Sequence, residues 1–382
     1  MNAILMLEDG FTLRGKAFAG SGEVLGEVVF NTGMTGYQEM VTDPSYKSQI
    51  LTFTYPLIGN YGCNSKDFES KTARAAAVLV KEYCKVPYSI YAEETFAEFL
   101  ERHDTIGIEG IDTRSLTLHL RRSGTMKGII STVCFDKEEL QAKVDRYPGI
   151  TGVDLVKEVT TDKRYGWPLP DEGKIFLPKN GSDPAFFRAG KEKPVSTAGK
   201  HVVVIDMGVK YSILNGLAMR GCRITVVPST TAISDIYELK PDGILFSNGP
   251  GDPAALDYLL PVVREFLGKL PVMGICLGHQ VMGRALGANT FKLNFGHRGG
   301  NHPVKDLTSN RVYITTQNHG FCISEDSKLE PGTKITHLNL NDNTVEGLAD
   351  EKRNFFSVQF HPEAGPGPHD CMNLFDKFAG MM

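Results

Sequence analysis

The sequence predicts an α/β protein: a doubly wound, mostly parallel C-terminal sheet that follows a strand-rich, mixed α+β N-terminal domain. Three observations lead to this prediction. Short strand-like segments dominate residues 1–150, polar sequence rich in proline, glycine and lysine fills residues 160–200, and strands alternate with helices from residue 201 onward. We therefore expect domains over residues 1–150 and 201–382, joined by a linker or surface crossing over residues 151–200.

The N-terminal half contains short apolar segments that are separated by turns. Such segments are typical of strands, and they occur at residues 3–7, 27–30, 49–54 and 75–80. Apolar residues recur at helical spacing in residues 95–102 and 113–122, and Asp112 is suited to cap the second helix. This half is therefore predicted to be a strand-rich mixed domain.

The C-terminal half opens with a βαβ unit. Residues 201–206 favour a strand, residues 210–220 a helix that ends at Gly221, and residues 223–228 a second strand. Alternation of this kind specifies a parallel sheet with helices on both faces. Functional sites in such sheets lie at the carboxyl ends of the strands.

Two further strand ends carry glycine-rich turns. The strand expected at residues 243–247 leads into Asn248-Gly-Pro-Gly-Asp-Pro253, and residues 254–267 then favour a helix kinked at Pro261. An apolar strand also precedes the turn around Cys276. We expect both turns at the same edge of the sheet.

Composition excludes several classes of function. The formal net charge of -4 and the lack of a Lys/Arg run argue against a DNA or RNA partner. Seven cysteines without Cys-x-x-Cys pairing suit a reducing compartment and make zinc improbable. The N-terminus lacks a basic leader, no stretch is long enough to span a membrane, and no nucleotide-binding glycine motif occurs. We expect a soluble, cytoplasmic protein without a bound metal or cofactor.

Cys276 is the candidate nucleophile. It stands between Gly274 and Gly278 where a strand is expected to turn into a helix. The unpaired amides at a helix start stabilise a thiolate and can hold an oxyanion. Bulk beside such a strained turn would clash, which accounts for the glycines. The alternative is a buried structural thiol, as free cysteines usually are.

His361 is the candidate base for this thiol. It ends a strand expected at residues 354–360 and is followed by Pro362, which favours an extended backbone. Residues two apart then face the same side, so Glu363 can orient the imidazole and stabilise its charged form. His279 lies next to the nucleophile but early in the following helix, and we interpret it as a packing or capping residue.

The backbone amides of Leu277 and Gly249 are candidates for an oxyanion hole. Leu277 directly follows the nucleophile, and a loop with two glycines can present its amides closely to a substrate. Taken alone, the Asn248–Pro253 loop is better explained as a tight turn with a helix cap. Its position at a neighbouring strand end favours function.

These motifs together resemble the class I (triad) glutamine amidotransferases. The resemblance rests on Gly274-Ile-Cys-Leu-Gly-His-Gln280, His361-Pro-Glu363 and the Gly249 loop. Across nearly the whole chain, other segments are similar to the carbamoyl-phosphate synthase small (glutaminase) chain family. These segments are Asn31-Thr-Gly-Met-Thr-Gly-Tyr-Gln-Glu39, Thr42-Asp-Pro-Ser-Tyr46, Thr54-Tyr-Pro-Leu-Ile-Gly-Asn60, Gly110-Ile-Asp-Thr-Arg114 and Phe295-Gly-His-Arg-Gly-Gly-Asn-His-Pro-Val304.

The resemblance implies roles for individual residues and a partner for the chain. Cys276 would be the nucleophile, His361 the base and Glu363 its orienter. Contacts to L-glutamine would come from Ser45, Gly249, Gly251, Leu277, Gln280, Asn318, Gly320 and Phe321. From the sequence alone, residues 317–321 favour a turn and Ser45 lies in an ordinary turn.

The resemblance also implies that the chain releases ammonia from glutamine for a large synthetase chain, in a heterodimer or a higher oligomer. That partner would bind ATP and Mg and make carbamoyl phosphate from bicarbonate for pyrimidine and arginine biosynthesis. The N-terminal domain would serve docking and contribute to the glutamine site.

Three other functions are compatible with parts of this pattern. The same glutaminase chemistry serves anthranilate, guanylate or cytidylate synthesis, although the resemblance implies that those amidotransferase domains match only the part from His201 onward. A catalytically silent scaffold subunit is a second alternative, which the intact Cys-His-Glu set disfavours. A cysteine hydrolase of other amides, such as a peptidase, is the third, because nucleophilic chemistry does not by itself name a substrate.

Overall fold

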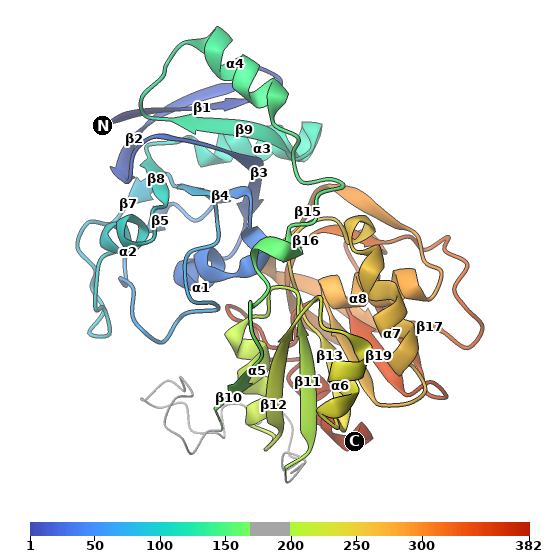
Figure 1. Ribbon diagram of the computed structural model, residues 1–382. Helices are drawn as coiled ribbons and strands as arrows, with labels where there is room; N and C mark the ends of the chain where they lie inside the picture. Colours follow the sequence, from blue (N-terminus) through green and yellow to red (C-terminus); the bar gives the residue numbers. More distant parts are fainter. Residues whose placement is uncertain (169–198) are drawn as a thin grey trace. The chain divides into compact units, whose positions relative to one another are not determined.

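The computed structural model describes residues 1–168 and 199–382, and within them the chain forms two compact units (Figure 1). The first unit comprises Met1–Val153 and Asn294–Gly299, and the second comprises Asp154–Leu293 and Gly300–Met382. Most of the linker expected at residues 151–200 lies outside the described residues. Of its described part, β10 (Tyr165–Trp167) pairs with a strand of the second unit.

A closed barrel forms the first unit. Its strands follow the order β1-β2-β8-β6-β4-β3-β9, and β9 pairs with β1 to close it. The strands β3, β4, β6 and β8 run parallel to one another, and the remaining pairings are antiparallel. The barrel strands are β1 (Asn2–Leu7), β2 (Thr12–Ala19), β3 (Glu23–Asn31), β4 (Gln49–Phe53), β6 (Ala77–Leu79), β8 (Ile106–Glu109) and β9 (Met126–Ser131).

Short helices and a two-stranded sheet accompany the barrel. The strands β5 and β7 pair with each other. These elements are α1 (Tyr37–Thr42), η1 (Pro44–Tyr46), β5 (Leu57–Ile58), β7 (Glu82–Tyr83), α2 (Phe96–Arg102), α3 (Thr113–Ser123) and α4 (Lys137–Arg146). The expected cap is confirmed, because the Asp112 carboxylate accepts a hydrogen bond from the Ser115 amide at 2.9 Å.

The expected elements of the first unit are found near their expected places. The four predicted strands correspond to β1, β3, β4 and β6, and the two predicted helices to α2 and α3. No pattern in the sequence predicted β2, β8, β9 or α4, or the short elements α1, β5 and β7. The mixed α+β class of this region is therefore confirmed, whereas closure of the sheet into a barrel was not foreseen.

A ten-stranded sheet forms the core of the second unit. Its order is β10-β12-β11-β13-β14-β19-β18-β16-β15-β17. Besides β10, its strands are β11 (His201–Asp206), β12 (Arg223–Pro228), β13 (Gly243–Phe246), β14 (Val272–Ile275), β15 (Thr290–Asp306), β16 (Val312–Ile323), β17 (Lys334–Asn339), β18 (Val345–Asp350) and β19 (Phe355–Val358). The five strands from β12 to β19 in this order are parallel, which confirms the predicted sheet.

Helices cover both faces of the parallel strands. Val203 and Ile205 of β11 pack in one apolar cluster with α6, α7 and α8, while Val202 and Val204 pack in another with α5 and α9. The helices and 3-10 turns of this unit are η2 (Val156–Glu158), α5 (Tyr211–Ala218), α6 (Ile233–Glu238), η4 (Pro253–Ala255), η5 (Asp257–Leu259), α7 (Leu260–Phe266), α8 (Leu277–Ala285) and α9 (Asn373–Met381). The doubly wound fold is thus confirmed, because alternate residues of the strand pack against helices on opposite faces of the sheet.

One predicted helix is wrong. The kinked helix expected at residues 254–267 is two 3-10 turns, η4 and η5, followed by α7. Pro261 lies in the first turn of α7, where a missing N–H breaks no intrahelical hydrogen bond. The proline therefore helps to start a helix rather than bending one.

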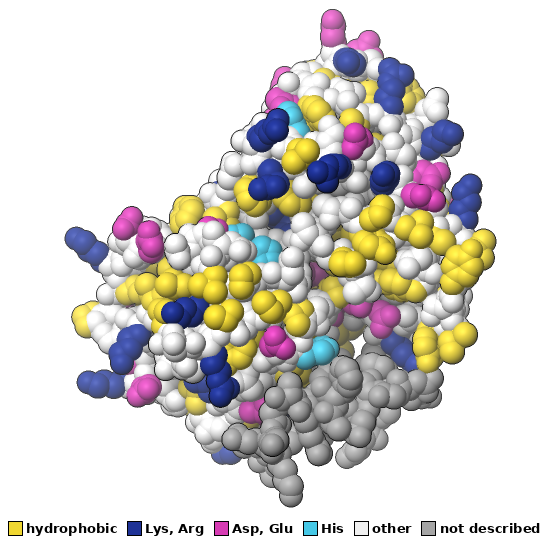
Figure 2. Space-filling model, turned by 180° about the vertical axis from the view of Figure 1, so that it is seen from behind, with side chains coloured by type: hydrophobic (Ala, Val, Ile, Leu, Met, Phe, Trp, Pro, Cys, Tyr) yellow, Lys and Arg dark blue, Asp and Glu magenta, His cyan; other side chains and the backbone are white. Residues whose placement is uncertain are grey.

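Surface charge in the described residues is mixed. Basic and acidic side chains are interspersed on the face that Figure 2 draws. Within residues 1–168 and 199–382, no helix is both long and apolar enough to cross a membrane.

Candidate active site

Cys276 occupies a strained position between β14 and α8. It is the N-cap residue of α8, with φ 54° and ψ -103°. A non-glycine residue in such a conformation costs about 1–3 kcal/mol and persists only where the surrounding fold imposes it. The expected strand-to-helix turn is therefore present, and it holds the cysteine at the carboxyl end of a central strand.

The flanking glycines are required by close packing. A Cβ on Gly278 would lie 2.2 Å from the carbonyl oxygen of Phe246 in β13. A Cβ on Gly274 would lie 2.5 Å from the Met282 sulfur and 2.9 Å from the Gly278 carbonyl oxygen. Both approaches are far closer than van der Waals contact. The predicted reason for the glycines is thus confirmed.

The sulfur of Cys276 is buried but has polar neighbours. The residue is 2% exposed and packs at the α5 and α9 face of the sheet. Its thiol points to the carbonyl oxygen of Asn318 at 3.7 Å, and the Gln359 carboxamide nitrogen donates to the sulfur at 3.6 Å. The sulfur therefore has both a hydrogen-bond donor and an acceptor beside it.

His361 and Glu363 meet as the sequence predicts. Nδ1 of His361 lies 2.5 Å from Oε1 of Glu363, and both side chains are buried. The backbone of His361 is held by a hydrogen bond from its amide to the Thr316 carbonyl at 2.9 Å. The carboxylate therefore fixes the ring by its Nδ1 side and leaves Nε2 for chemistry.

Burial and neighbouring charges act in opposite directions on the pKa of His361. Burial is the largest single effect and lowers the pKa of His361, as does Lys210, but Glu363 and Cys276 together outweigh them, so the net pKa is raised. Nε2 forms no hydrogen bond of ordinary geometry within the described residues. The Cys276 side chain nevertheless acts on the ring, because it favours the charged imidazole and so raises the pKa of His361.

Lys210 is a residue that the sequence analysis missed. It follows β11, and its ammonium lies 3.0 Å from Oε1 of Glu363 and 2.7 Å from the carbonyl oxygen of Ala364. The side chains of Lys210 and Glu363 are 2% and 0% exposed. Burial raises the pKa of Glu363, but Lys210 and then His361 lower it, and their combined effect is larger, so the net pKa is lowered to about 2 and the carboxylate is ionised. The position of Lys210 just after a strand of the parallel sheet was the feature of the sequence that could have indicated a role in the site.

The glycine loop lies next to the start of α8. A Cβ on Gly249 would be 2.0 Å from the Met207 carbonyl oxygen and 2.8 Å from Cδ2 of Leu277. Leu277 is the first residue of α8, where an amide has no intrahelical acceptor. Gly251 has φ 89°, and the Asp252 carboxylate caps η4 through the Ala254 amide. The loop is thus a cap as well as a neighbour of the predicted oxyanion amide.

Residues 317–321 are a strand and not the turn that the sequence favoured. They belong to β16, which brings Asn318, Gly320 and Phe321 close to the α8 helix. The Gln280 carboxamide of α8 donates to the carbonyl oxygen of Phe321 at 2.6 Å. Four predicted glutamine contacts are therefore grouped near the cysteine turn.

Ser45 lies in the first unit, whereas every other predicted site residue lies in the second. It belongs to η1, and its backbone amide donates a hydrogen bond to the Asp43 carboxylate at 2.9 Å. The segment is therefore a capped 3-10 helix and not an ordinary turn.

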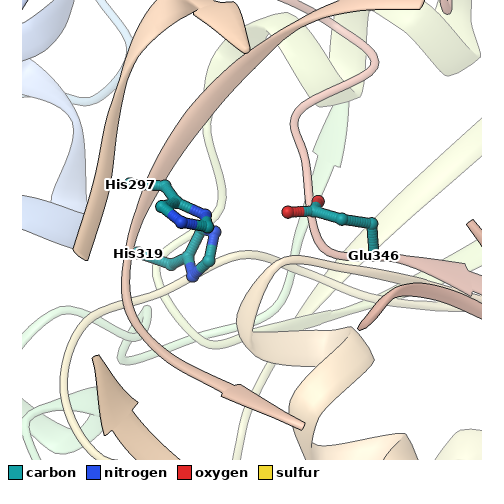
Figure 3. A group of neighbouring side chains, drawn as sticks. All are labelled: His297, His319 and Glu346. Atoms are coloured by element: carbon teal, nitrogen blue, oxygen red, sulfur yellow. The ribbon is translucent and has the colours of Figure 1, made fainter. Parts of the chain in front are cut away.

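The neighbouring histidines make structural contacts. His279 is fully buried and hydrogen-bonds to the Ser357 hydroxyl through Nδ1 at 2.9 Å, which confirms its packing role. Burial, and then His337, lower the pKa of His279 to about 3. Figure 3 shows the carboxylate of Glu346 directed toward His319, and the Gln317 carboxamide hydrogen-bonds to both. This buried network ties β16 to β18.

The fold and this cysteine, histidine and carboxylate arrangement define a class I glutamine amidotransferase. The family described as glutamine amidotransferase class-I matches residues 203–381. The carbamoyl-phosphate synthase small chain, CPSase domain, matches residues 5–130.

Full-length relatives make the assignment more specific. The carbamoyl phosphate synthase small chain of Syntrophotalea carbinolica is 48% identical over 100% of this chain and 98% of its own. That of Porphyra purpurea is 48% identical over 100% of this chain and 96% of its own. The chain belongs to the carbamoyl-phosphate synthase small chain family.

Proposed function

We propose that the chain is the glutaminase subunit of a glutamine-hydrolysing carbamoyl-phosphate synthase. The observation that supports this most is the strained Cys276 beside a His361–Glu363 pair whose Nδ1 to Oε1 distance is 2.5 Å. Such a set activates a thiol and returns its proton to a leaving amine. L-glutamine is the substrate, and a cysteinyl thioester is the intermediate.

The first half of the reaction forms the thioester. The Cys276 thiolate attacks the δ-carbonyl carbon of glutamine, and the carbonyl electrons move onto oxygen. The amides of Gly249 and Leu277 are proposed to hold this oxyanion. When it collapses, the C–N bond breaks, and the His361 imidazolium gives its proton to the departing nitrogen, which leaves as ammonia.

The second half regenerates the enzyme. Water attacks the thioester carbonyl while neutral His361 takes a proton from it. The C–S bond breaks, glutamate leaves, and the thiolate of Cys276 is restored beside the imidazolium. Glu363 stabilises the charged ring in both halves without taking its proton.

Substrate recognition is assigned to polar groups around this turn. Glutamine carries an α-ammonium, an α-carboxylate and an amide, so its pocket must be rich in polar and backbone contacts. By family resemblance we assign these contacts to Ser45, Gly249, Gly251, Leu277, Gln280, Asn318, Gly320 and Phe321. Residues 1–150 are proposed to dock the partner.

The ammonia is destined for a large synthetase chain. Free ammonia is protonated and lost in bulk water, so we infer an internal route to that partner in a heterodimer or a higher assembly of heterodimers. The partner makes carbamoyl phosphate from bicarbonate and ATP, with ATP and Mg bound there, for pyrimidine and arginine biosynthesis. All seven cysteines are free thiols, which supports a cytoplasmic location.

A trapping experiment tests the glutaminase proposal. The full chain is mixed with isotopically labelled glutamine and quenched in acid, and the peptide that carries Cys276 is analysed by mass spectrometry. Label on that peptide, lost on mild base treatment, is expected. Label from a peptide amide but none from glutamine would instead support a different cysteine hydrolase.

A reconstitution experiment tests the acceptor. The chain is combined with the large carbamoyl-phosphate synthase chain, and glutamine-dependent formation of carbamoyl phosphate is measured. Formation of carbamoyl phosphate is expected. Ammonia release without it would favour an amidotransferase that serves another synthetase.

A further inference from the structure

Gln359 lies against the sulfur of Cys276 and has no role in the reaction described above. It is 0% exposed and stands two residues before His361, and its amide donates to the Glu346 carbonyl at 2.9 Å. Its carboxamide nitrogen lies 3.6 Å from Sγ of Cys276. A side chain in contact with the reacting atom merits a test of its chemistry.

Neighbouring hydrogen bonds determine which end of the Gln359 carboxamide faces the sulfur. The carbonyl oxygen of Phe321 can only accept, so the group of Gln280 that lies 2.6 Å away must be its NH₂. The same nitrogen of Gln280 lies 3.0 Å from Oε1 of Gln359 and donates to it. The Gln359 oxygen is thereby engaged, and its NH₂ group is directed at the sulfur.

We propose that Gln359 is a further catalytic residue, whose side-chain N–H donates to the Cys276 sulfur and stabilises it as the thiolate. The inference rests on the glutaminase reaction proposed above. The thiolate is needed twice, as the attacking group and as the group expelled when water cleaves the thioester. The two heteroatoms of the Gln359 side chain thus have separate tasks, one toward Gln280 and one toward Cys276.

The physical reason is the asymmetry of the sulfur's neighbours. The Asn318 carbonyl oxygen, at 3.7 Å, accepts from a neutral thiol but repels a thiolate. An N–H group does the reverse, because hydrogen bonds to an ionised acceptor are about twice as strong as those between neutral groups. The titratable group that interacts with Cys276 is His361, which is hydrogen-bonded to Glu363, and Glu363 in turn pairs with Lys210. Gln359 therefore supplies a donor that does not titrate.

The pH dependence of Cys276 alkylation tests the proposal without using turnover. The full chain reacts with iodoacetamide across a pH series, and the alkylated Cys276 peptide is quantified by mass spectrometry. Gln359→Met removes the donor at similar length, and we expect its alkylation midpoint to rise by about one pH unit. Gln359→Glu places an oxygen in the donor's place and is expected to raise the midpoint more.

Two further variants separate this role from a purely structural one. Gln280→Met removes the donor that orients the Gln359 carboxamide, and a smaller rise in the midpoint is expected. Asn339→Ala removes another buried carboxamide of the same unit, which donates to Glu346, and should leave the midpoint unchanged. Variants are compared by circular dichroism and melting temperature.

The alkylation midpoints of the Gln359 and Gln280 variants decide between the two roles. Raised midpoints in folded Gln359 variants support the proposal, and kcat for glutamine hydrolysis should fall by about 10- to 100-fold. An unchanged midpoint in Gln359→Met or Gln280→Met would overturn it, even if kcat fell. A chain that alkylates with these shifts yet does not hydrolyse glutamine would refute the proposed function instead.

Discussion

Lys210 and Glu363 form an ion pair in the interior of the second unit, with Nζ 3.0 Å from Oε1. The same carboxylate oxygen lies 2.5 Å from Nδ1 of His361. Glu363 is therefore shared between two cationic groups. The ammonium competes with the imidazole for the carboxylate and lowers the pKa of His361, while Glu363 raises it. The basicity of the buried ring therefore depends on the balance between these two charges as well as on burial.

Removal of Lys210 should shift the pH dependence of turnover. In Lys210→Met, Glu363 stabilises the imidazolium without competition, so the pKa of His361 rises further. Water attack on the thioester needs neutral imidazole, so the acidic limb of the kcat profile for glutamine hydrolysis should move to higher pH. The position of this limb is measured from steady-state ammonia release between pH 6 and pH 9. A limb that stays in place, or moves to lower pH, would show that Lys210 does not tune the ring.

Stability measurements supply the controls for this variant. Breaking a buried ion pair costs about 3–5 kcal/mol, because the remaining charge is left uncompensated. The double variant Lys210→Met with Glu363→Gln leaves neither charge buried. Its unfolding midpoint should lie at a higher urea concentration than that of Glu363→Gln alone. Lys269→Met breaks an exposed, solvent-screened pair with Glu265 and should leave the urea midpoint of unfolding nearly unchanged.

Gly278 should not tolerate a methyl group. In Gly278→Ala the new Cβ would meet the Phe246 carbonyl oxygen at 2.2 Å, so α8 or β13 must move. We expect a loss of about 1–3 kcal/mol in the free energy of unfolding and a larger loss in kcat. Gly380→Ala in α9 is the matched control, because its Cβ would meet no atom within 4 Å. Equal stability of the two variants, measured by urea unfolding, would contradict the packing argument.

His279 should make stability fall in acid. The folded protein keeps its ring neutral down to a pKa of about 3, while the unfolded chain binds a proton below about pH 6.5. The contribution of His279 is thus present at neutral pH and lost toward pH 3, by about 1.4 kcal/mol per pH unit. His279→Gln should lose less stability than the wild type between pH 7 and pH 5. If the urea midpoints of the two proteins fell by the same amount between pH 7 and pH 5, this prediction would be refuted.

The sequence predicts the parallel sheet and the cysteine turn well, because both depend on local pattern. The expected strand at residues 201–206 is β11, and the cysteine turn follows β14 as expected. The contact between His361 and Glu363 was predictable because it joins residues two positions apart. Local spacing and a proline were sufficient to place them.

Contacts between distant parts of the chain could not be predicted in this way. Lys210 and Glu363 are 153 positions apart, and Gln359 reaches Cys276 across 83. Residues 317–321 form a strand because of pairing and buried contacts with distant parts of the chain, which the local Asn-His-Gly sequence does not indicate. In the barrel, β2 carries Arg14 and Lys16 and has only a short apolar run at its end, so its sequence carries no clear signal for its pairing with β1.

The central claim is that Cys276 is the nucleophile that releases ammonia for a partner chain. Its most direct test is Cys276→Ser in complex with the large carbamoyl-phosphate synthase chain, assayed with glutamine and, separately, with ammonium salt. We expect glutamine-dependent synthesis of carbamoyl phosphate to fall by at least about 10³-fold, with ammonia-dependent synthesis retained. Retained glutamine-dependent synthesis, or loss of both activities in a folded complex, would contradict it.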